Sequence, residues 1–410
     1  MKEKTYTLKD FVLSEEKDIT SLAGEFQKYI DQQSRYESKS YWVCSESGVG
    51  ATMRLSDRPE KEVDAYISND YLGMSQNEET KAAGIEAVLK YGTGACAAQA
   101  IGGYLDLHQD LEKRIARFVG QEDAILFSSG FGANAGLLRA ILGKNDVAYV
   151  DSFIHTSATS GLAGTNVKNI GHNNVEYLDA VLGRPHDYRT RVVIIDGVYS
   201  QDGDLSRLPD YVEVCRKHGC LLMMDDAHGI GVMGKTGRGT AEHFGMLGQI
   251  DLITGTFSKS FGCVGGFVAA SRELIQYLRY YADSNVFSAA ISPQATASIS
   301  KALDIMERDP TVRESLWDTV GYLRRRLTEE GFDIGKSVSP IFPIMVRDND
   351  KVYSIADELQ KRNIFVSGIV YPAVRTKEAR LRVSILSTHS KTQLDHLVES
   401  LVDIRNIIPF

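Results

Sequence analysis

The sequence has few cysteines, no dense basic block and no long apolar run. Its five cysteines include no Cys-x-x-Cys pair and leave an odd thiol, which fits a reducing compartment better than a disulfide framework, and we expect no metal site. A formal charge of −8 without clustered Lys and Arg argues against a general nucleic-acid binder. Apolar runs such as residues 192–195 are far shorter than the ~20 residues that span a bilayer. These absences favour a small-molecule partner.

The first residues lack the apolar core of a signal peptide, so we expect the protein in the cytoplasm and leave contact with a membrane surface open. The chain has 410 residues, of which 43% are hydrophobic, enough to bury a large core. We expect three parts: an N-terminal arm at residues 1–65 with an amphipathic stretch at 19–36, a large α/β domain at 66–300, and a small α+β domain at 301–410.

Short β-rich runs alternate with longer amphipathic segments in the large part. The runs are residues 124–127, 148–150, 191–195, 220–224, 252–254 and 266–270, and the segments are residues 77–90, 105–119 and 134–142. This alternation predicts a mainly parallel sheet with helices on both faces. Further on, the pattern predicts helices at residues 310–330, 352–361 and 392–404 and strands at 341–346 and 381–385.

Lys259 lies in a turn rich in hydroxyl groups, residues 256–262, which follows a short apolar run. A lysine amine can form a Schiff base with the aldehyde of pyridoxal phosphate, and a carboxylate at a strand end can pair with the protonated ring nitrogen. Asp225 ends such a strand. The pattern therefore predicts a pyridoxal 5'-phosphate enzyme that makes or breaks bonds at the α-carbon of an amino acid.

Asp225 and His228 follow a continuous apolar run, as expected for a buried parallel strand whose carboxyl end carries ligands. His228 can reach the phenolic oxygen of the cofactor ring or a substrate group. A turn-capping aspartate and a core histidine would give the same pair. The glycines of residues 229–234 match a dinucleotide fingerprint, but residues 225–228 separate them from the strand and a loop follows them, which disfavours nicotinamide binding.

The glycine-rich residues 128–136 follow a strand and lead into an apolar helix. Backbone N–H groups at such a helix start can bind a phosphate, although a close-packed turn is the alternative. His155 follows the run 148–150 and could stack on a pyridine ring, whereas a lone loop histidine is usually solvated. Ser200 follows the run 192–195 and can reach the same edge of the sheet.

Together these features resemble the α-oxoamine synthase family, fold-type-I pyridoxal phosphate enzymes that condense an amino acid with an acyl thioester and release carbon dioxide. The resemblance rests on residues 69–73, 129–131, 155, 196–200, 225–229, 256–259 and 381–384. It implies a fold-type-I architecture with a mainly parallel sheet and a smaller α+β C-terminal domain. An aminotransferase or threonine-type lyase is the rival enzyme, and a silent partner subunit is disfavoured because this chain retains its lysine.

The resemblance also implies roles for the matching residues around the cofactor. Lys259 would carry the cofactor and remove the α-proton, Asp225 would pair with the ring nitrogen, and His155 would stack on the ring. Ser200 and His228 match positions near the phenolic oxygen. The implied phosphate ligands are Thr256 and the backbone of Gly130, Phe131 and Gly132.

Substrate and partner roles follow in the same way. Ser288 matches a residue that reaches the phosphate of the neighbouring subunit, which implies a homodimer with shared active sites. Arg382 matches the arginine that holds the substrate carboxylate, a task suited to a forked guanidinium. Asn69 lies in the matching segment at residues 69–73 and is expected to contact the substrate.

Within the family, residues 103–112 are most similar to serine palmitoyltransferases. This implies L-serine or a relative such as cysteate, and a long-chain thioester of coenzyme A or acyl carrier protein, as in sphingolipid biosynthesis. Gln99 stands where many members have an arginine, which leaves the acyl donor or the amino-acid side chain open. Members of the 2-amino-3-ketobutyrate CoA ligase and 8-amino-7-oxononanoate synthase types are therefore alternatives.

Overall fold

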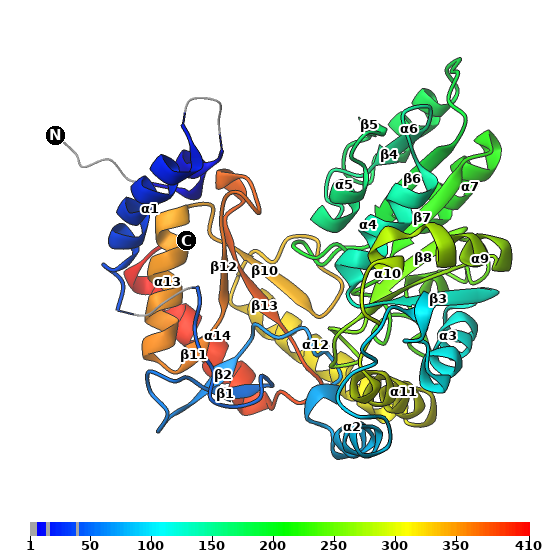
Figure 1. The fold of residues 1–410 in the computed structure, drawn as a ribbon. Coiled ribbons are helices and arrows are strands. Elements are labelled where there is room, and N and C mark those ends of the chain that lie inside the picture. The colour runs from blue at the N-terminus through cyan, green and yellow to red at the C-terminus, as the bar shows by residue number, and fades with distance from the viewer. Residues whose placement is uncertain (1–5, 14–16, 38–40) are drawn as a thin grey trace. The chain divides into compact units, whose positions relative to one another are not determined.

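The computed structural model describes residues 6–13, 17–37 and 41–410. Residues 1–5, on which the signal-peptide expectation rests, lie outside this part. The chain divides into two compact units, one of residues 69–317 and one of residues 1–68 and 318–410 (Figure 1). The sequence suggested three successive parts instead. The N-terminal segment belongs to the same unit as the C-terminal residues, and the suggested boundary at residue 300 falls inside the helix α11 (Pro293–Arg308).

The unit of residues 69–317 is built on a seven-stranded sheet in the order β3-β9-β8-β7-β6-β4-β5. Its strands are β3 (Asp123–Phe127), β4 (Val147–Val150), β5 (Asn166–Asn169), β6 (Arg191–Asp196), β7 (Leu221–Asp225), β8 (Leu252–Thr256) and β9 (Gly266–Ala270). The pairs among β5, β4, β6, β7 and β8 are parallel, and β9 pairs antiparallel with β3 and β8. The predicted mainly parallel sheet is confirmed. β5 escaped prediction because all four of its residues are exposed and it carries little apolar pattern.

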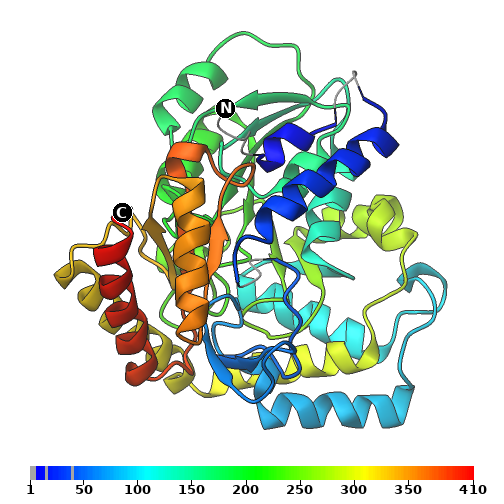
Figure 2. The same cartoon turned by 90° about the vertical axis from the view of Figure 1, so that its left-hand side faces the viewer.

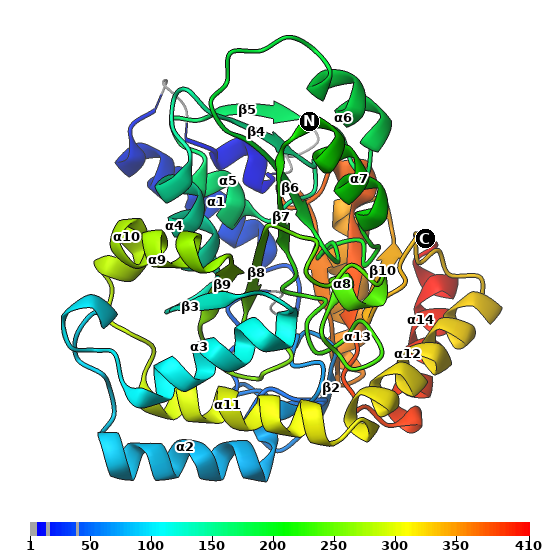
Figure 3. The same ribbon diagram turned by 90° about the vertical axis from the view of Figure 1, so that its right-hand side faces the viewer.

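Helices cover both faces of this sheet (Figure 3). The helices of this unit are α2 (Glu78–Tyr91), α3 (Asp106–Val119), α4 (Gly130–Ile141), α5 (Thr156–Gly161), α6 (Val175–Leu182), α7 (Leu208–His218), α8 (Thr240–His243), α9 (Arg272–Tyr281), α10 (Asp283–Val286) and α11. The helix predicted to start at residue 134 begins at Gly130, because the Ser129 side chain accepts from the Gly132 N–H and caps it there.

The core between sheet and helices explains the continuous apolar strands. β6 and β7 are buried along almost their whole length, as expected for parallel strands covered on both faces. Ile125, Leu137, Leu252 and Val268 belong to one buried cluster. Full burial of such a side chain is worth roughly 1.5–3 kcal/mol, so this core can hold the strand ends in fixed positions.

The other unit combines helices with two small three-stranded sheets, β1-β2-β11 and β10-β13-β12. Its elements are α1 (Ile19–Gln33), β1 (Thr52–Arg54), β2 (Glu62–Ala65), β10 (Ile341–Met345), α13 (Asn349–Lys361), β11 (Ile364–Phe365), β12 (Ser367–Ile369), β13 (Arg380–Ser384) and α14 (Lys391–Ile407), and α12 (Thr311–Glu329) begins before it. Figure 2 shows α1, α13 and α14 in blue, orange and red. The α+β character predicted for the C-terminal residues is confirmed. None of the helices in the described part of the chain has the length and apolar composition needed to cross a bilayer.

Candidate active site

Four parallel strands end at one edge of the seven-stranded sheet and surround a cavity of about 270 Å³. Asp196 at the end of β6 is paired in register with Asp225 at the end of β7. The lining residues are Ser129, Gly130, Phe131, Asn134, His155, Ser157, Asp196, Val198, Ser200, Asp225, Ala227, His228, Gly255, Thr256, Ser258, Lys259, Val264 and Gly265. Segments far apart in sequence therefore meet because the parallel strands end together.

The carboxylate of Asp225 is held by two hydrogen-bond donors. The side-chain amide of Asn134, in the second turn of α4, donates to Asp225 Oδ2 at 2.6 Å. The backbone N–H of Ala227 donates to Asp225 Oδ1 at 3.0 Å. Donors on both oxygens fix the direction of the carboxylate. Asp225 is thus oriented toward the cavity that it lines.

His155 is tied to the same network. Asn134 also donates to the Ser157 hydroxyl at 2.8 Å, and that hydroxyl lies 2.7 Å from His155 Nδ1. The Ser157 N–H donates to the same nitrogen at 3.2 Å, which assigns Nδ1 as an acceptor and the ring as neutral. Burial lowers the pKa of His155 although solvent reaches it from the cavity, and the Asp225 charge opposes this shift while Lys259 adds to it.

His228 is buried beside the cavity and bonded to Tyr71, whose hydroxyl lies 2.7 Å from His228 Nδ1. Tyr71 also donates to the Asn69 side chain at 3.3 Å. Tyr71 thus fixes the histidine ring and links it to the segment in which Asn69 was expected to contact a substrate.

Two further carboxyl groups lie near Asp225. Burial, reinforced by the Asp225 charge, raises the pKa of Asp196 well above its ordinary value. Burial also raises the pKa of Asp226 to about 7, although hydrogen bonds from Thr240 oppose the shift. Burial beside another carboxylate thus disfavours the charged forms of Asp196 and Asp226.

The start of α4 and the turn after β8 form the other end of the cavity. Ser129, Gly130 and Phe131 lie at the helix N-terminus, where backbone N–H groups and the helix dipole favour an anion. A Cβ on Gly130 would lie 2.8 Å from the Thr256 Cβ, so only glycine allows this close approach. The Thr256 hydroxyl lies 2.8 Å from that of Ser258. This end presents hydroxyl and amide donors suited to a phosphate.

Most residues proposed from the sequence line this cavity, but four do not. Gly132 donates its N–H to the Ser129 cap. Ser288 lies outside the cavity, with its hydroxyl 3.3 Å from that of Ser128. Asn69 contacts Tyr71, and Arg382 lies on β13 of the other unit, where it donates to the Ser384 hydroxyl at 2.7 Å. The binding roles of these four residues, like those of the residues that line the cavity, stay predictions.

Sequence reasoning missed Asn134, Ser157 and Tyr71 as parts of the site. Each of them holds a side chain that was proposed from the sequence. Asn134 lies in the glycine-rich helix start and Tyr71 lies in a motif that carried the family resemblance, so both segments were flagged without their roles. Asn134 is only 2% exposed, and its burial against the sheet becomes visible only in the structure.

Comparison with known proteins agrees with this geometry. Residues 67–401 match the model of the aminotransferase class I and II family. The chain belongs to this family. A serine palmitoyltransferase of Sphingobacterium spiritivorum is 40% identical over 346 residues, which cover 84% of this chain and 87% of that protein. An 8-amino-7-oxononanoate synthase of Thermoanaerobacter pseudethanolicus is 39% identical over 338 residues, which cover 82% and 86%.

A solved structure of serine palmitoyltransferase from S. paucimobilis resembles the chain with a TM-score of 0.89 at 29% identity, covering 96% of this chain and 99% of that one. The protein is therefore an α-oxoamine synthase similar to serine palmitoyltransferases, and it is a pyridoxal phosphate-dependent C-acyltransferase. The expected family, fold type, cofactor and enzyme class are confirmed. The cavity fits the cofactor because a carboxylate, a histidine, a lysine and a phosphate-suited helix start line it together.

Proposed function

We propose that the enzyme condenses L-serine, or a close relative such as cysteate, with a long-chain acyl thioester to give an aminoketone of the 3-ketosphinganine type, carbon dioxide and a free thiol. The observation that carries this proposal is the similarity to serine palmitoyltransferases over more than four fifths of the chain. The similar match to 8-amino-7-oxononanoate synthases supports that reaction type as the second candidate. Sphingolipid biosynthesis is the process that the first candidate serves.

The residues of the cavity support distinct roles in this reaction. Bound pyridoxal phosphate supplies an electron sink for the substrate α-carbon. Lys259 would hold the cofactor aldehyde, and its amine would be the base that takes the substrate α-proton. Asp225, oriented by Asn134, keeps a proton on the ring nitrogen. The neutral His155 offers its flat ring to the face of the cofactor.

The remaining contacts fix the cofactor and the amino acid. His228 and Ser200 serve the phenolic oxygen, and Thr256 with the backbone at residues 130–132 serves the phosphate. Arg382 holds the α-carboxylate through its forked donors, and Asn69 contacts the substrate. Exclusion of bulk water from the cavity would limit side reactions at the substrate α-carbon.

A homodimer completes the proposed site. Phe287, directly before Ser288, is 87% exposed, and Phe131 and Val264 at the cavity are also largely exposed. Exposed apolar side chains around a catalytic cavity are typical of a surface that a partner covers. A second copy of the chain on this surface would bring Ser288 to the phosphate of its neighbour.

The deciding experiment supplies the purified enzyme with several amino acids and acyl thioesters and follows free thiol and product mass. We expect serine or cysteate with a C16-type thioester to give a higher kcat/KM than acetyl or succinyl thioesters with glycine, because each buried methylene adds about 0.8 kcal/mol. Coenzyme A and acyl carrier protein thioesters are compared at equal chain length. A short-chain pair with the higher kcat/KM would overturn the proposed substrates, and 8-amino-7-oxononanoate as the favoured product would establish the second candidate.

A further inference from the structure

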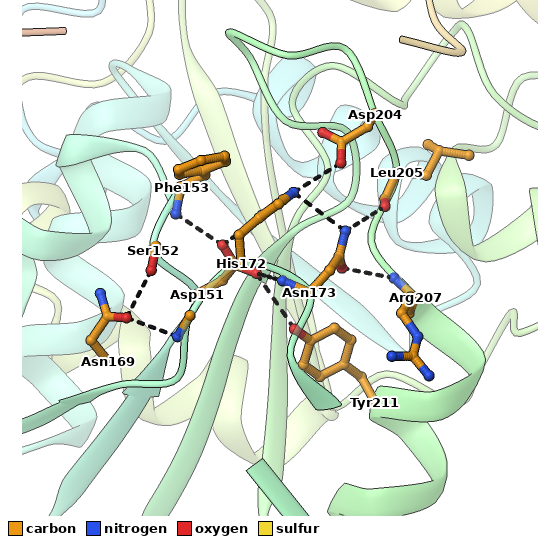
Figure 4. Close-up of polar contacts among 11 residues, drawn as sticks. Asp151, Ser152, Phe153, Asn169, His172, Asn173, Asp204, Leu205, Arg207 and Tyr211 are labelled. Atoms are coloured by element: carbon orange, nitrogen blue, oxygen red, sulfur yellow. Dashed lines mark hydrogen bonds and ion pairs between the residues drawn. The ribbon is translucent and has the colours of Figure 1, made fainter. Parts of the chain in front are cut away.

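His172 lies in the turn between β5 and α6, outside the cavity, and its ring is held by two carboxylates (Figure 4). Its Nδ1 lies 3.0 Å from Asp151 Oδ1, and its Nε2 lies 2.9 Å from Asp204 Oδ2. Histidine donates from both ring nitrogens only when it is positively charged. The two contacts therefore describe an imidazolium that bridges two carboxylates.

Asp151 holds one segment of the cavity lining, the residues 151–155 that end at His155. It directly follows β4, is only 1% exposed, and accepts from the Phe153 N–H at 2.9 Å and from the Asn173 N–H at 2.7 Å. The same short segment then reaches His155, which lines the cavity. The Asp151 side chain therefore holds, through the Phe153 N–H, the segment that carries His155.

Asp204 holds a second segment of the cavity lining, the loop that carries Ser200. It lies in the loop of residues 197–206, which closes on itself through a bridge between Val198 and Leu205 and through the Tyr199 N–H, which donates to the Asp204 carbonyl at 3.0 Å. This loop carries Ser200, which lines the cavity together with His155 from the segment after β4. His172 therefore connects the segment of His155 to the loop of Ser200.

A neutral contact accompanies the charged one. The Asn173 side-chain amide donates to the Leu205 carbonyl at 2.9 Å, while its N–H binds Asp151, so it joins the same two segments. Because Asn173 remains when His172 is changed, loss of the imidazolium should weaken the link between the two segments without breaking it. The effect of the His172 charge can therefore be measured in a variant that keeps the Asn173 contacts.

The groups that face His172 keep it charged at neutral pH. Phe153 stacks on the ring at 4.3 Å and Tyr199 meets it edge-on at 4.5 Å. Burial alone would lower the pKa of His172, but the hydrogen bonds and charges of Asp151 and Asp204 raise it to about 9.

Two other charged or titratable side chains border this cluster. The Tyr211 hydroxyl donates to Asp151 at 3.5 Å, and burial raises its pKa further from the neutral range. The Arg207 guanidinium forms ion pairs with Glu176 and Asp210, which balance its positive charge. His172 is thus the member of this cluster whose pKa, at about 9, lies within reach of an alkaline titration.

We propose that His172 is a positioning residue whose charge locks the His155 segment against the Ser200 loop and so sets the cofactor cavity between them. The inference rests on the proposed contacts of His155 and Ser200 with pyridoxal phosphate. It adds a role for a side chain that does not line the cavity, and it predicts that the cofactor site loosens when His172 loses its proton.

The first test compares His172→Gln with His186→Gln, a change at an exposed histidine. We expect His172→Gln to weaken pyridoxal phosphate binding at least tenfold and to reduce the visible circular dichroism of the bound cofactor, with an unchanged far-ultraviolet spectrum. Asp204→Asn should act in the same direction with a smaller effect. Cofactor affinity and visible dichroism within twofold of wild type in His172→Gln would overturn the proposal.

The second test reads the charge itself. In the wild type, the ring nitrogens of ¹⁵N-labelled His172 should titrate near pH 9, and the visible dichroism should fall over the same range. His172→Gly should regain cofactor affinity when imidazole is added at pH 7. A His172 that is neutral at pH 8 in the folded wild type would overturn the proposal even if the variants fail to fold. These readouts need no substrate, so an error in the proposed amino acid or thioester would leave them unaffected.

Discussion

Replacement of Asn134 by alanine tests whether the orientation of Asp225 controls the cofactor. The Asn134 amide lies 2.6 Å from Asp225 Oδ2 and is buried, so no bulk water replaces the lost donor directly. A hydrogen bond to a charged group contributes roughly 1.5–3 kcal/mol. At 1.4 kcal/mol per factor of ten, we expect Asn134→Ala to weaken pyridoxal phosphate binding about 10- to 150-fold.

The assay is a titration of the cofactor-free protein with pyridoxal phosphate, followed by absorbance, together with kcat for the preferred substrates. The same change in an Asp225→Ala background is the control, because a double-mutant cycle isolates the coupling between the two side chains. There, Asn134→Ala should weaken binding less than about threefold, since the contact that it removes is already lost. Equal losses in both backgrounds, or binding near the wild-type value in Asn134→Ala alone, would refute the role of Asn134.

Three further changes probe other parts of the site. Lys259→Ala should abolish turnover and the absorbance of the lysine-bound cofactor, and full activity in this variant would end the proposed mechanism. Arg382→Lys should raise KM for the amino acid about ten- to a hundredfold despite the retained charge, because the forked donors are lost, whereas an unchanged KM would remove Arg382 from the substrate site. The folded pKa of Asp226, about 7, lies above its ordinary 3.8, so the folded state binds the extra proton and stability falls as pH rises from about 4 to 7. Asp226→Asn should remove this decline, on the order of 4 kcal/mol, in urea unfolding of the cofactor-free protein, and an equally steep decline in the variant would contradict the assignment.

The strands were predictable because both faces of the parallel sheet are covered, which makes β6 and β7 continuous apolar runs, and each of these runs ends in an aspartate. Lys259 and Asp225 could be proposed for the same reason, since residue type and strand end coincide in the sequence. Asn134 could not, because its partner is set by the packing of α4 against the sheet. The bridge through His172 depends on the adjacency of β5, β4 and β6, which no local pattern encodes.

The carboxyl groups at the strand ends show how one fold assigns different charges to one residue type. Asp225 has two donors and lines the cavity, which suits its proposed contact with the ring nitrogen of the cofactor. Asp196, its neighbour in register, is buried beside that charge, and both effects favour its neutral form. Asp151 faces the imidazolium of His172 instead, so its charge is compensated before the cofactor binds. The protonation state of each aspartate thus depends on neighbouring donors and charges. A variant that changes one of these neighbours should therefore alter the absorbance of the bound cofactor even where the protein still folds.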